Sequence, residues 1–116
     1  MAQQIKKRTI TIAEKGGTFS TIFHKIKGSK KNSGISSLRR LLSNEKARLL
    51  HVCKTKQPRS IYELAKTLGR DFKAVREDIR LLEQFGLVEL TSSIKNNRER
   101  LRPIVDADKL EITINL

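Results

Sequence analysis

The stretch SIYELAKTLGRDFKAVREDIRLLEQFGLVEL, residues 60–90, decides the fold of this chain. Ser60 and Glu63 have the spacing of a capping box, in which the serine hydroxyl accepts a hydrogen bond from the third helical N–H. Apolar residues follow at helical spacing, at Ile61, Leu64, Ala65 and Leu68. Gly69 then ends the helix, because glycine tolerates the left-handed backbone of a C-terminal cap. The pattern predicts a short amphipathic helix between Ser60 and Gly69.

A second helix is predicted directly after a tight turn. Asp71 can cap it, and its carboxylate there also meets the positive end of the helix dipole. The apolar face consists of Phe72, Val75, Ile79 and Leu82, and Phe85 extends it. Gly86 closes the helix, and the apolar residues at 87, 88 and 90 predict a strand. Two short helices joined by a tight turn are the sequence form of a helix-turn-helix, which fits a DNA major groove.

The net charge of the 116-residue chain is +13, from 25 Lys and Arg against 12 Asp and Glu. Such an excess favours a polyanion as partner: DNA, RNA, an anionic membrane surface or an acidic protein. Residues 1–42 hold ten basic residues and one acidic residue, whereas residues 43–90 hold ten and seven. Most of the excess charge therefore lies outside the helix-turn-helix. The length fits one domain with a modest core.

Residues 1–35 are predicted to form a basic N-terminal segment. Alternation around Ile10 and Ile12 predicts a half-buried strand over residues 7–12. A helix is expected within residues 18–27, where four apolar side chains share one helical face: Phe19, Ile22, Phe23 and Ile26. We interpret that face as packing, dimer or partner surface. The following stretch GSKKNSG, residues 28–34, has linker composition and either contacts phosphates or stays solvated.

Residues 36–116 are predicted to form a winged helix-turn-helix domain of the α+β class. A short helix is expected over residues 37–42, and Ser43 caps another that runs to about residue 54. The core side of that second helix is expected to hold Ala47, Leu49, Leu50, Val52 and Cys53. After the strand at 87–90, residues 91–100 predict a polar loop. A return strand follows, with Pro103 at a sheet edge.

A clean alternation of apolar and polar residues closes the chain, with Leu110, Ile112, Ile114 and Leu116 apolar. This alternation predicts a C-terminal strand. A terminal strand needs a pairing partner to remain ordered. The candidates are the strand at 7–12, the same segment in a second copy, and a partner protein.

Basic residues on the second helix and on the predicted wing are the candidate DNA contacts. Arginine and lysine there can donate to guanine O6 and N7 or to phosphates. The complete candidate set is Arg59, Ser60, Arg70, Lys73, Arg76, Arg80, Lys95, Arg98 and Arg100. The alternative for each basic residue is an ordinary charged face turned to solvent.

Enzymatic, metal-binding and membrane-spanning functions find no support in the sequence. The two histidines, His24 and His51, have no ligand spacing with Cys53, and no zinc pattern or glycine-rich phosphate loop occurs. We therefore expect no catalytic residue, no metal and no cofactor. No long apolar run indicates a signal peptide or membrane span, so a cytoplasmic location is the default.

Two segments carry a family resemblance: LGRDFKAVREDIRLLEQFGLVEL, residues 68–90, and VDADKLEITINL, residues 105–116. They resemble winged-helix DNA-binding proteins of archaea and bacteria related to the MarR-type regulators, and the resemblance covers residues 36–116. Some members look like antitoxins of toxin–antitoxin pairs, which implies a repressor that binds its own operator and neutralises a toxin. The family usually has a polar residue such as Asn at the position of Ala74, which cannot hydrogen-bond a base edge.

The expected function is therefore a sequence-specific regulator that binds double-stranded DNA as a homodimer, as the autoregulating antitoxin of a toxin–antitoxin pair. A cognate toxin would be covered by the N-terminal third or by the last strand. The alternative is an RNA-binding or ribosome-associated basic module. An aromatic content of 4% argues against that alternative, because single strands are commonly recognised by stacking.

Overall fold

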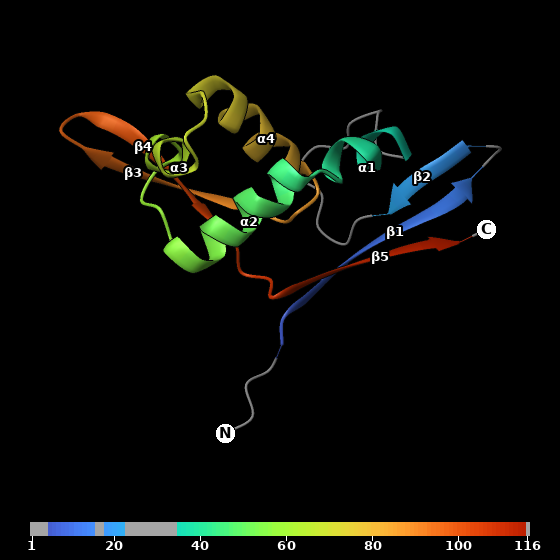
Figure 1. Cartoon of the computed structure of the whole chain (residues 1–116). Coiled ribbons are helices and arrows are strands. Elements are labelled where there is room, and N and C mark those ends of the chain that lie inside the picture. Colours follow the sequence, from blue (N-terminus) through green and yellow to red (C-terminus); the bar gives the residue numbers. More distant parts are fainter. Residues whose placement is uncertain (1–4, 16–17, 23–34, 116) are drawn as a thin grey trace.

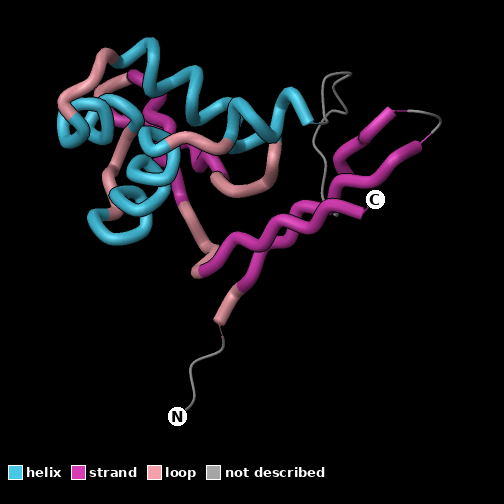
Figure 2. Tube along the Cα trace, turned by 45° about the vertical axis from the view of Figure 1, so that its right-hand side comes forward, coloured by secondary structure: helices cyan, strands magenta, loops and turns pink. Residues whose placement is uncertain are grey.

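Four helices and two small sheets make up the part of the chain that the computed structural model describes, residues 5–15, 18–22 and 35–115 (Figure 1). The elements in chain order are β1 (Lys7–Lys15), β2 (Thr18–Ile22), α1 (Ile35–Leu41), α2 (Asn44–Lys56), α3 (Ile61–Leu68), α4 (Phe72–Gln84), β3 (Glu89–Lys95), β4 (Arg98–Ile104) and β5 (Lys109–Asn115). The α+β class is confirmed. The hairpin of β3 and β4 lies on one side of the helices, and the sheet of β1, β2 and β5 lies on the other side, next to α1 (Figure 2). Ile10 and Ile12 of β1 are buried in the same core as Leu38 and Leu41 of α1.

Helices α3 and α4 begin and end where the capping signals predict. Ser60 Oγ accepts a hydrogen bond of 3.0 Å from the N–H of Glu63. Asp71 Oδ2 accepts one of 3.2 Å from the N–H of the third residue of α4. Gly69 and Gly86, at the C-terminal ends, have φ angles of 66° and 74° in the left-handed region. Each end carries the paired backbone bonds of a Schellman motif, so the turn between the two helices is set locally.

The core beside α4 contains most of the apolar face that the sequence predicts. Val75, Ile79 and Leu82 are fully buried, but Phe72 is 42% exposed. Phe72 is the first residue of α4, and its ring lies against the exposed ring of Tyr62 on α3 instead of in the core, with centroids 6.4 Å apart. The predicted core position of Phe72 is therefore wrong.

Helix α2 is capped by Ser43 as predicted, and it extends two residues beyond the predicted end. Leu49 and Cys53 are buried, while Ala47 is exposed, so the prediction of a core position was wrong for Ala47. Burial raises the pKa of the Cys53 thiol to about 12. Cys53 is therefore an unreactive core residue at neutral pH.

The hairpin replaces the polar loop that was predicted over residues 91–100. Strands β3 and β4 pair from Glu89 with Ile104 to Lys95 with Arg98, which leaves a turn of only two residues, 96 and 97. Both turn residues are asparagines with positive φ, 54° and 60°. Asparagine tolerates this conformation, and such two-residue turns match the twist of an antiparallel pair. The strand predicted at 87–90 starts at Glu89, after two buried residues.

The three-stranded sheet joins the two ends of the described chain. Strand β1 pairs antiparallel with β2 and parallel with β5, with Ile10 opposite Ile112 and Ile12 opposite Ile114. Pairing of the C-terminal strand with the N-terminal strand, one of the three candidates, is thus confirmed. The division at residue 35 stays a prediction, and strands from both sides of that division share this sheet.

Strand β2 corrects the helix expected within residues 18–27. The segment Thr18–Ile22 is TFSTI, which is rich in β-branched and aromatic residues, and β1 offers it a partner two residues upstream in the sequence. Pairing with β1 therefore prevails over the helical spacing of the apolar residues. The rest of the expected helix and the basic stretch 28–34 lie outside the described residues.

A cluster of charged groups fastens the starts of β1 and β5 to α2. Asp108 Oδ2 accepts a hydrogen bond of 3.0 Å from the N–H of Lys6, and Asp108 Oδ1 lies 2.9 Å from Lys54 Nζ. Lys6 Nζ in turn forms an ion pair of 3.0 Å with Asp106. The backbone hydrogen bond from Lys6, followed by the interaction with Lys54, lowers the pKa of the Asp108 carboxyl below its ordinary value.

The lowered pKa of Asp108 predicts a loss of stability in acid. The ionised carboxylate stabilises the fold above its unfolded-state pKa, close to 3.8, and this contribution is lost as the pH falls through the lower folded-state pKa. We expect wild-type protein to melt at a higher temperature than Asp108→Asn at about pH 6, and the difference to shrink below about pH 4. Thermal melts followed by circular dichroism measure this. A difference that stays constant into strong acid would contradict it.

Candidate nucleic-acid interface

A groove of about 950 Å³ lies between α3, the start of α4 and β4, and we call it the α3–β4 groove. Its volume lies within the range of ligand sites, roughly 300–1,000 Å³. The residues relevant to binding are the basic Lys66, Arg76, Arg98 and Arg100, the aromatic Tyr62 and Phe72, and the acidic Glu63 and Glu99. The groove thus combines positive charge with exposed aromatic rings.

The hairpin contributes a column of basic side chains. In its register, Lys95 lies opposite Arg98, and residue 93 lies opposite Arg100. Because strand side chains alternate between faces, Arg98, Arg100 and Arg102 share one face of β4. The opposite face carries Leu101 and Pro103, which are partly or fully buried. Arg102 was missing from the predicted set, since the two-residue steps from Arg98 to Arg100 and from Arg100 to Arg102 signal a common face only in a strand.

The exposed basic residues of α4 lie partly inside and partly outside the α3–β4 groove. Lys73, Arg76 and Arg80 are all exposed, and their helical spacing places them on one side of α4. Arg76 is the one of these three that lines the groove, together with Arg98 and Arg100 from the hairpin. The structure therefore brings together residues that lie more than twenty positions apart in the sequence.

Arg59 and Ser60 lie at the entrance to α3. The Arg59 side chain is exposed, next to the groove-lining Ser60. The Ser60 hydroxyl already accepts a hydrogen bond from the backbone of α3. A hydroxyl can still donate its own proton, so Ser60 keeps one hydrogen bond to offer a ligand.

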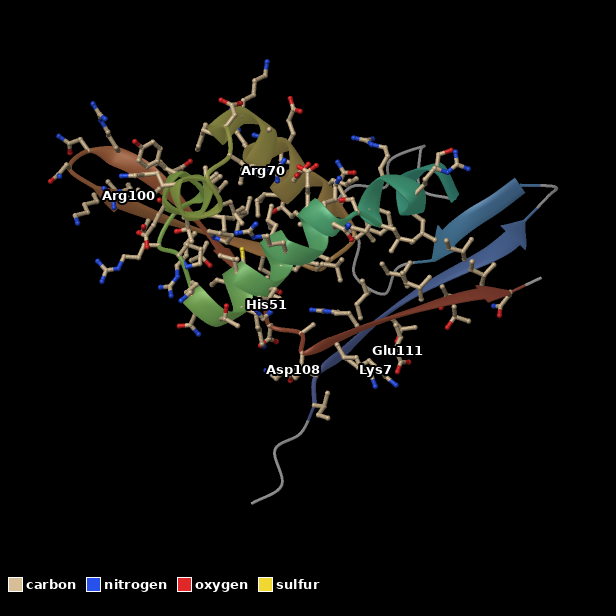
Figure 3. The ribbon with its side chains drawn as sticks, viewed as in Figure 1. Lys7, His51, Arg70, Arg100, Asp108 and Glu111 are labelled. Carbon is tan, nitrogen blue, oxygen red and sulfur yellow. The ribbon has the colours of Figure 1, made fainter. Side chains whose placement is uncertain are left out.

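Arg70 differs from the other predicted contacts because it is engaged within the protein (Figure 3). Its Nη1 lies 2.9 Å from Asp78 Oδ2, and its Nη2 lies 3.2 Å from Glu45 Oε2. Among the described residues, Nη1 has no well-aligned hydrogen-bond acceptor, so the contact with Asp78 is an ion pair. Lys46 approaches the same carboxylate at 3.7 Å. Arg70 thus ties the turn between α3 and α4 to α2.

Ion pairing leaves the groove positively charged. Within residues 5–15, 18–22 and 35–115, the ion pairs form two groups. One joins Arg70 and Lys46 to Asp78 and Glu45, and the other joins lysines to Asp106 and Asp108, just before β5, and to Glu111 on β5. Lys7, for example, lies 3.4 Å from Glu111 (Figure 3). The basic side chains of the groove and the hairpin therefore have no carboxylate partner in the described structure.

The described residues contain no cluster of three or more His, Cys, Asp and Glu side chains that could hold a metal ion. His51 is exposed on α2, whereas Cys53 is buried on another face of the same helix. None of the described helices has the length and apolar character needed to cross a membrane.

These features define the described chain as an α+β protein with an exposed basic groove between a helix pair and a hairpin. The chain belongs to the HVO_A0114 family, whose model matches residues 41–112. The match includes α2, α3, α4 and the hairpin, and therefore the whole α3–β4 groove, but not β1 or β2. No curated protein matches the chain.

Proposed function

We propose that this protein is a transcriptional regulator that binds double-stranded DNA through a winged helix-turn-helix. In this proposal α3 and α4 are the helix-turn-helix, α4 is the reading helix and the β3–β4 hairpin is the wing. The observation that carries the proposal is the placement of Arg76 on α4 together with Arg98 and Arg100 on the hairpin. All three line one groove, and none has a carboxylate partner among the described residues.

The chemistry of this surface suits a duplex. A major groove about 12 Å wide admits a helix, and arginine can donate two hydrogen bonds to guanine or bind phosphate. Arg76 and Lys73 would contact the major groove from the N-terminal half of α4. Arg98, Arg100 and Arg102 of the hairpin would bind the phosphates of the DNA backbone. Ala74 is partly buried, so base reading would be left to its exposed neighbours.

We further propose that the regulator acts as a homodimer in the cytoplasm. A two-fold dimer reads two half-sites about 34–36 Å apart. The sheet order β2–β1–β5 leaves the outer edge of β5 without a strand partner among the described residues, and Ile114 on this strand is 50% exposed. A strand from a second copy of the chain, or from the toxin that the family resemblance implies, could pair with that edge.

Binding to duplex DNA at several salt concentrations tests this function. Each phosphate neutralised by Lys or Arg lowers the slope of log affinity against log salt by about 0.9. Four to six contacts therefore predict a slope of about −4 to −5 in fluorescence anisotropy. We also expect DNA from upstream of the protein's own gene to bind more tightly than random duplex. Equal affinity for both, or no salt dependence, would contradict specific regulation.

The RNA-binding alternative has one structural observation in its favour, the exposed rings of Tyr62 and Phe72 in the α3–β4 groove. Rings of this kind stack on the bases of single strands. The same anisotropy experiment with a single-stranded RNA of equal length separates the two functions. Tighter binding of the RNA than of duplex DNA would favour the alternative.

A further inference from the structure

Two aromatic side chains are exposed side by side in a protein that has only four Phe and one Tyr. Tyr62 is 62% exposed and Phe72 is 42% exposed, whereas Phe85 is buried. Full burial of a Phe side chain is worth roughly 1.5–3 kcal/mol relative to exposure. Leaving two rings in solvent forgoes that stabilisation, so the core does not explain their placement.

The surroundings of these rings indicate what they bind. Lys66 Nζ lies 5.7 Å from the centroid of the Tyr62 ring, and Arg76, Arg98 and Arg100 line the same groove. Rings that stack on bases, next to cations that bind phosphates, are the combination found in sites for unpaired nucleotides. An uncharged apolar partner would gain nothing from these cations. The bases of an intact duplex are stacked on each other, so their faces are not accessible to the rings.

We propose that the Tyr62–Phe72 pair stacks on an unpaired nucleobase, so that the α3–β4 groove prefers DNA containing an unpaired nucleotide to a perfect duplex. The inference rests on the proposed function, because the cations of the same groove hold the flanking phosphates. Extruding a paired base from a duplex costs a few kcal/mol. A base that is already unpaired can reach the rings without this cost. The preference is therefore for bulged or gapped DNA.

The local geometry allows this stacking. The two rings are tilted by 49°, and their centroids are 6.4 Å apart. Because Tyr62 is mostly exposed, part of its ring is open to a base. The side chain of Lys66 is long and flexible, so its ammonium can leave the Tyr62 ring and bind the phosphate of the stacked nucleotide.

The test compares two DNA duplexes of equal length at one salt concentration, one perfect and one with a central bulge of unpaired thymines. Wild-type protein should bind the bulged duplex roughly 5- to 100-fold more tightly, the range expected for stacking of one base on an aromatic side chain. Tyr62→Leu and Phe72→Leu should lose most of this preference, measured as the ratio of the affinities of each variant for the two duplexes. Tyr62→Phe, which keeps the ring, should retain the preference.

The two proposals fail in different ways in this experiment. Equal affinity of wild-type protein for both duplexes would overturn the stacking inference and leave duplex binding intact. The stacking inference would also be overturned if the leucine variants kept the preference for the bulged duplex and melted at the wild-type temperature. Absence of binding to either duplex would overturn the proposed function together with the inference.

Discussion

A variant with both Arg76→Ala and Arg100→Ala is expected to bind duplex DNA at least about 30-fold more weakly than the wild type, while melting at the same temperature. The two residues belong to α4 and to the hairpin, and both line the α3–β4 groove. The contact of Arg76 with a base would contribute about 1–3 kcal/mol, and loss of the phosphate contact of Arg100 weakens binding further, so the two losses together reach about 30-fold or more. Both side chains are exposed and have no described ion pair, so the fold loses little.

The matched control for this double variant is Arg39→Ala with Arg40→Ala. These exposed residues in the last turn of α1 carry the same charge, and α1 lies away from the hairpin (Figure 1). Fluorescence anisotropy should show near wild-type affinity for the control. The groove variant should also have a salt slope shallower by about 1, because it loses the phosphate contact of Arg100. If both double variants lose the same affinity, net charge and not the groove would be responsible.

Ile79→Asp is expected to unfold the helical part of the protein. Ile79 is fully buried on α4, so the substitution places an unpaired carboxylate in the core. An unpartnered buried charge costs several kcal/mol, which is comparable to the total stability of a small domain, about 5–15 kcal/mol. Circular dichroism should show loss of helical signal and of a cooperative melting transition.

Ile79→Val is the control for this core substitution. It keeps an apolar side chain at the same site and should cost only about 0.5–1.5 kcal/mol. We therefore expect it to fold and to bind DNA like the wild type. A cooperative melt of Ile79→Asp near the wild-type temperature would show that α4 does not pack as described.

Much of the helical part could be predicted from the sequence because its signals are local. The caps Ser60 and Asp71 and the glycines at 69 and 86 act on backbone groups only a few residues away. A strand, a polar loop and a return strand were predicted after α4, but the extension of both strands to a two-residue turn could not be predicted in the same way. Thr91 to Arg100 are exposed throughout, so no alternation of apolar and polar residues distinguishes these strands from a polar loop.

The candidate site was predicted as a set of basic residues but not as an arrangement. Arg76, Arg98 and Arg100 were selected from the sequence, and the structure places them in one groove. Arg70 looked equivalent to them, yet it pairs with Asp78 and with a glutamate on α2. Phe72 followed the core spacing of its helix but lies in the groove, because the first turn of α4 extends past the core.

By itself, the sequence determined the helix-turn pattern of residues 60–86, the apolar face of α4 and the excess of positive charge. These properties depend on capping and periodicity, which act between residues close together in the chain. The tertiary structure alone decided that β1 pairs with β5, which cations are neutralised, and that Tyr62 and Phe72 meet in a basic groove. Ion pairing and burial depend on neighbours from distant segments, and only the folded chain brings those segments together.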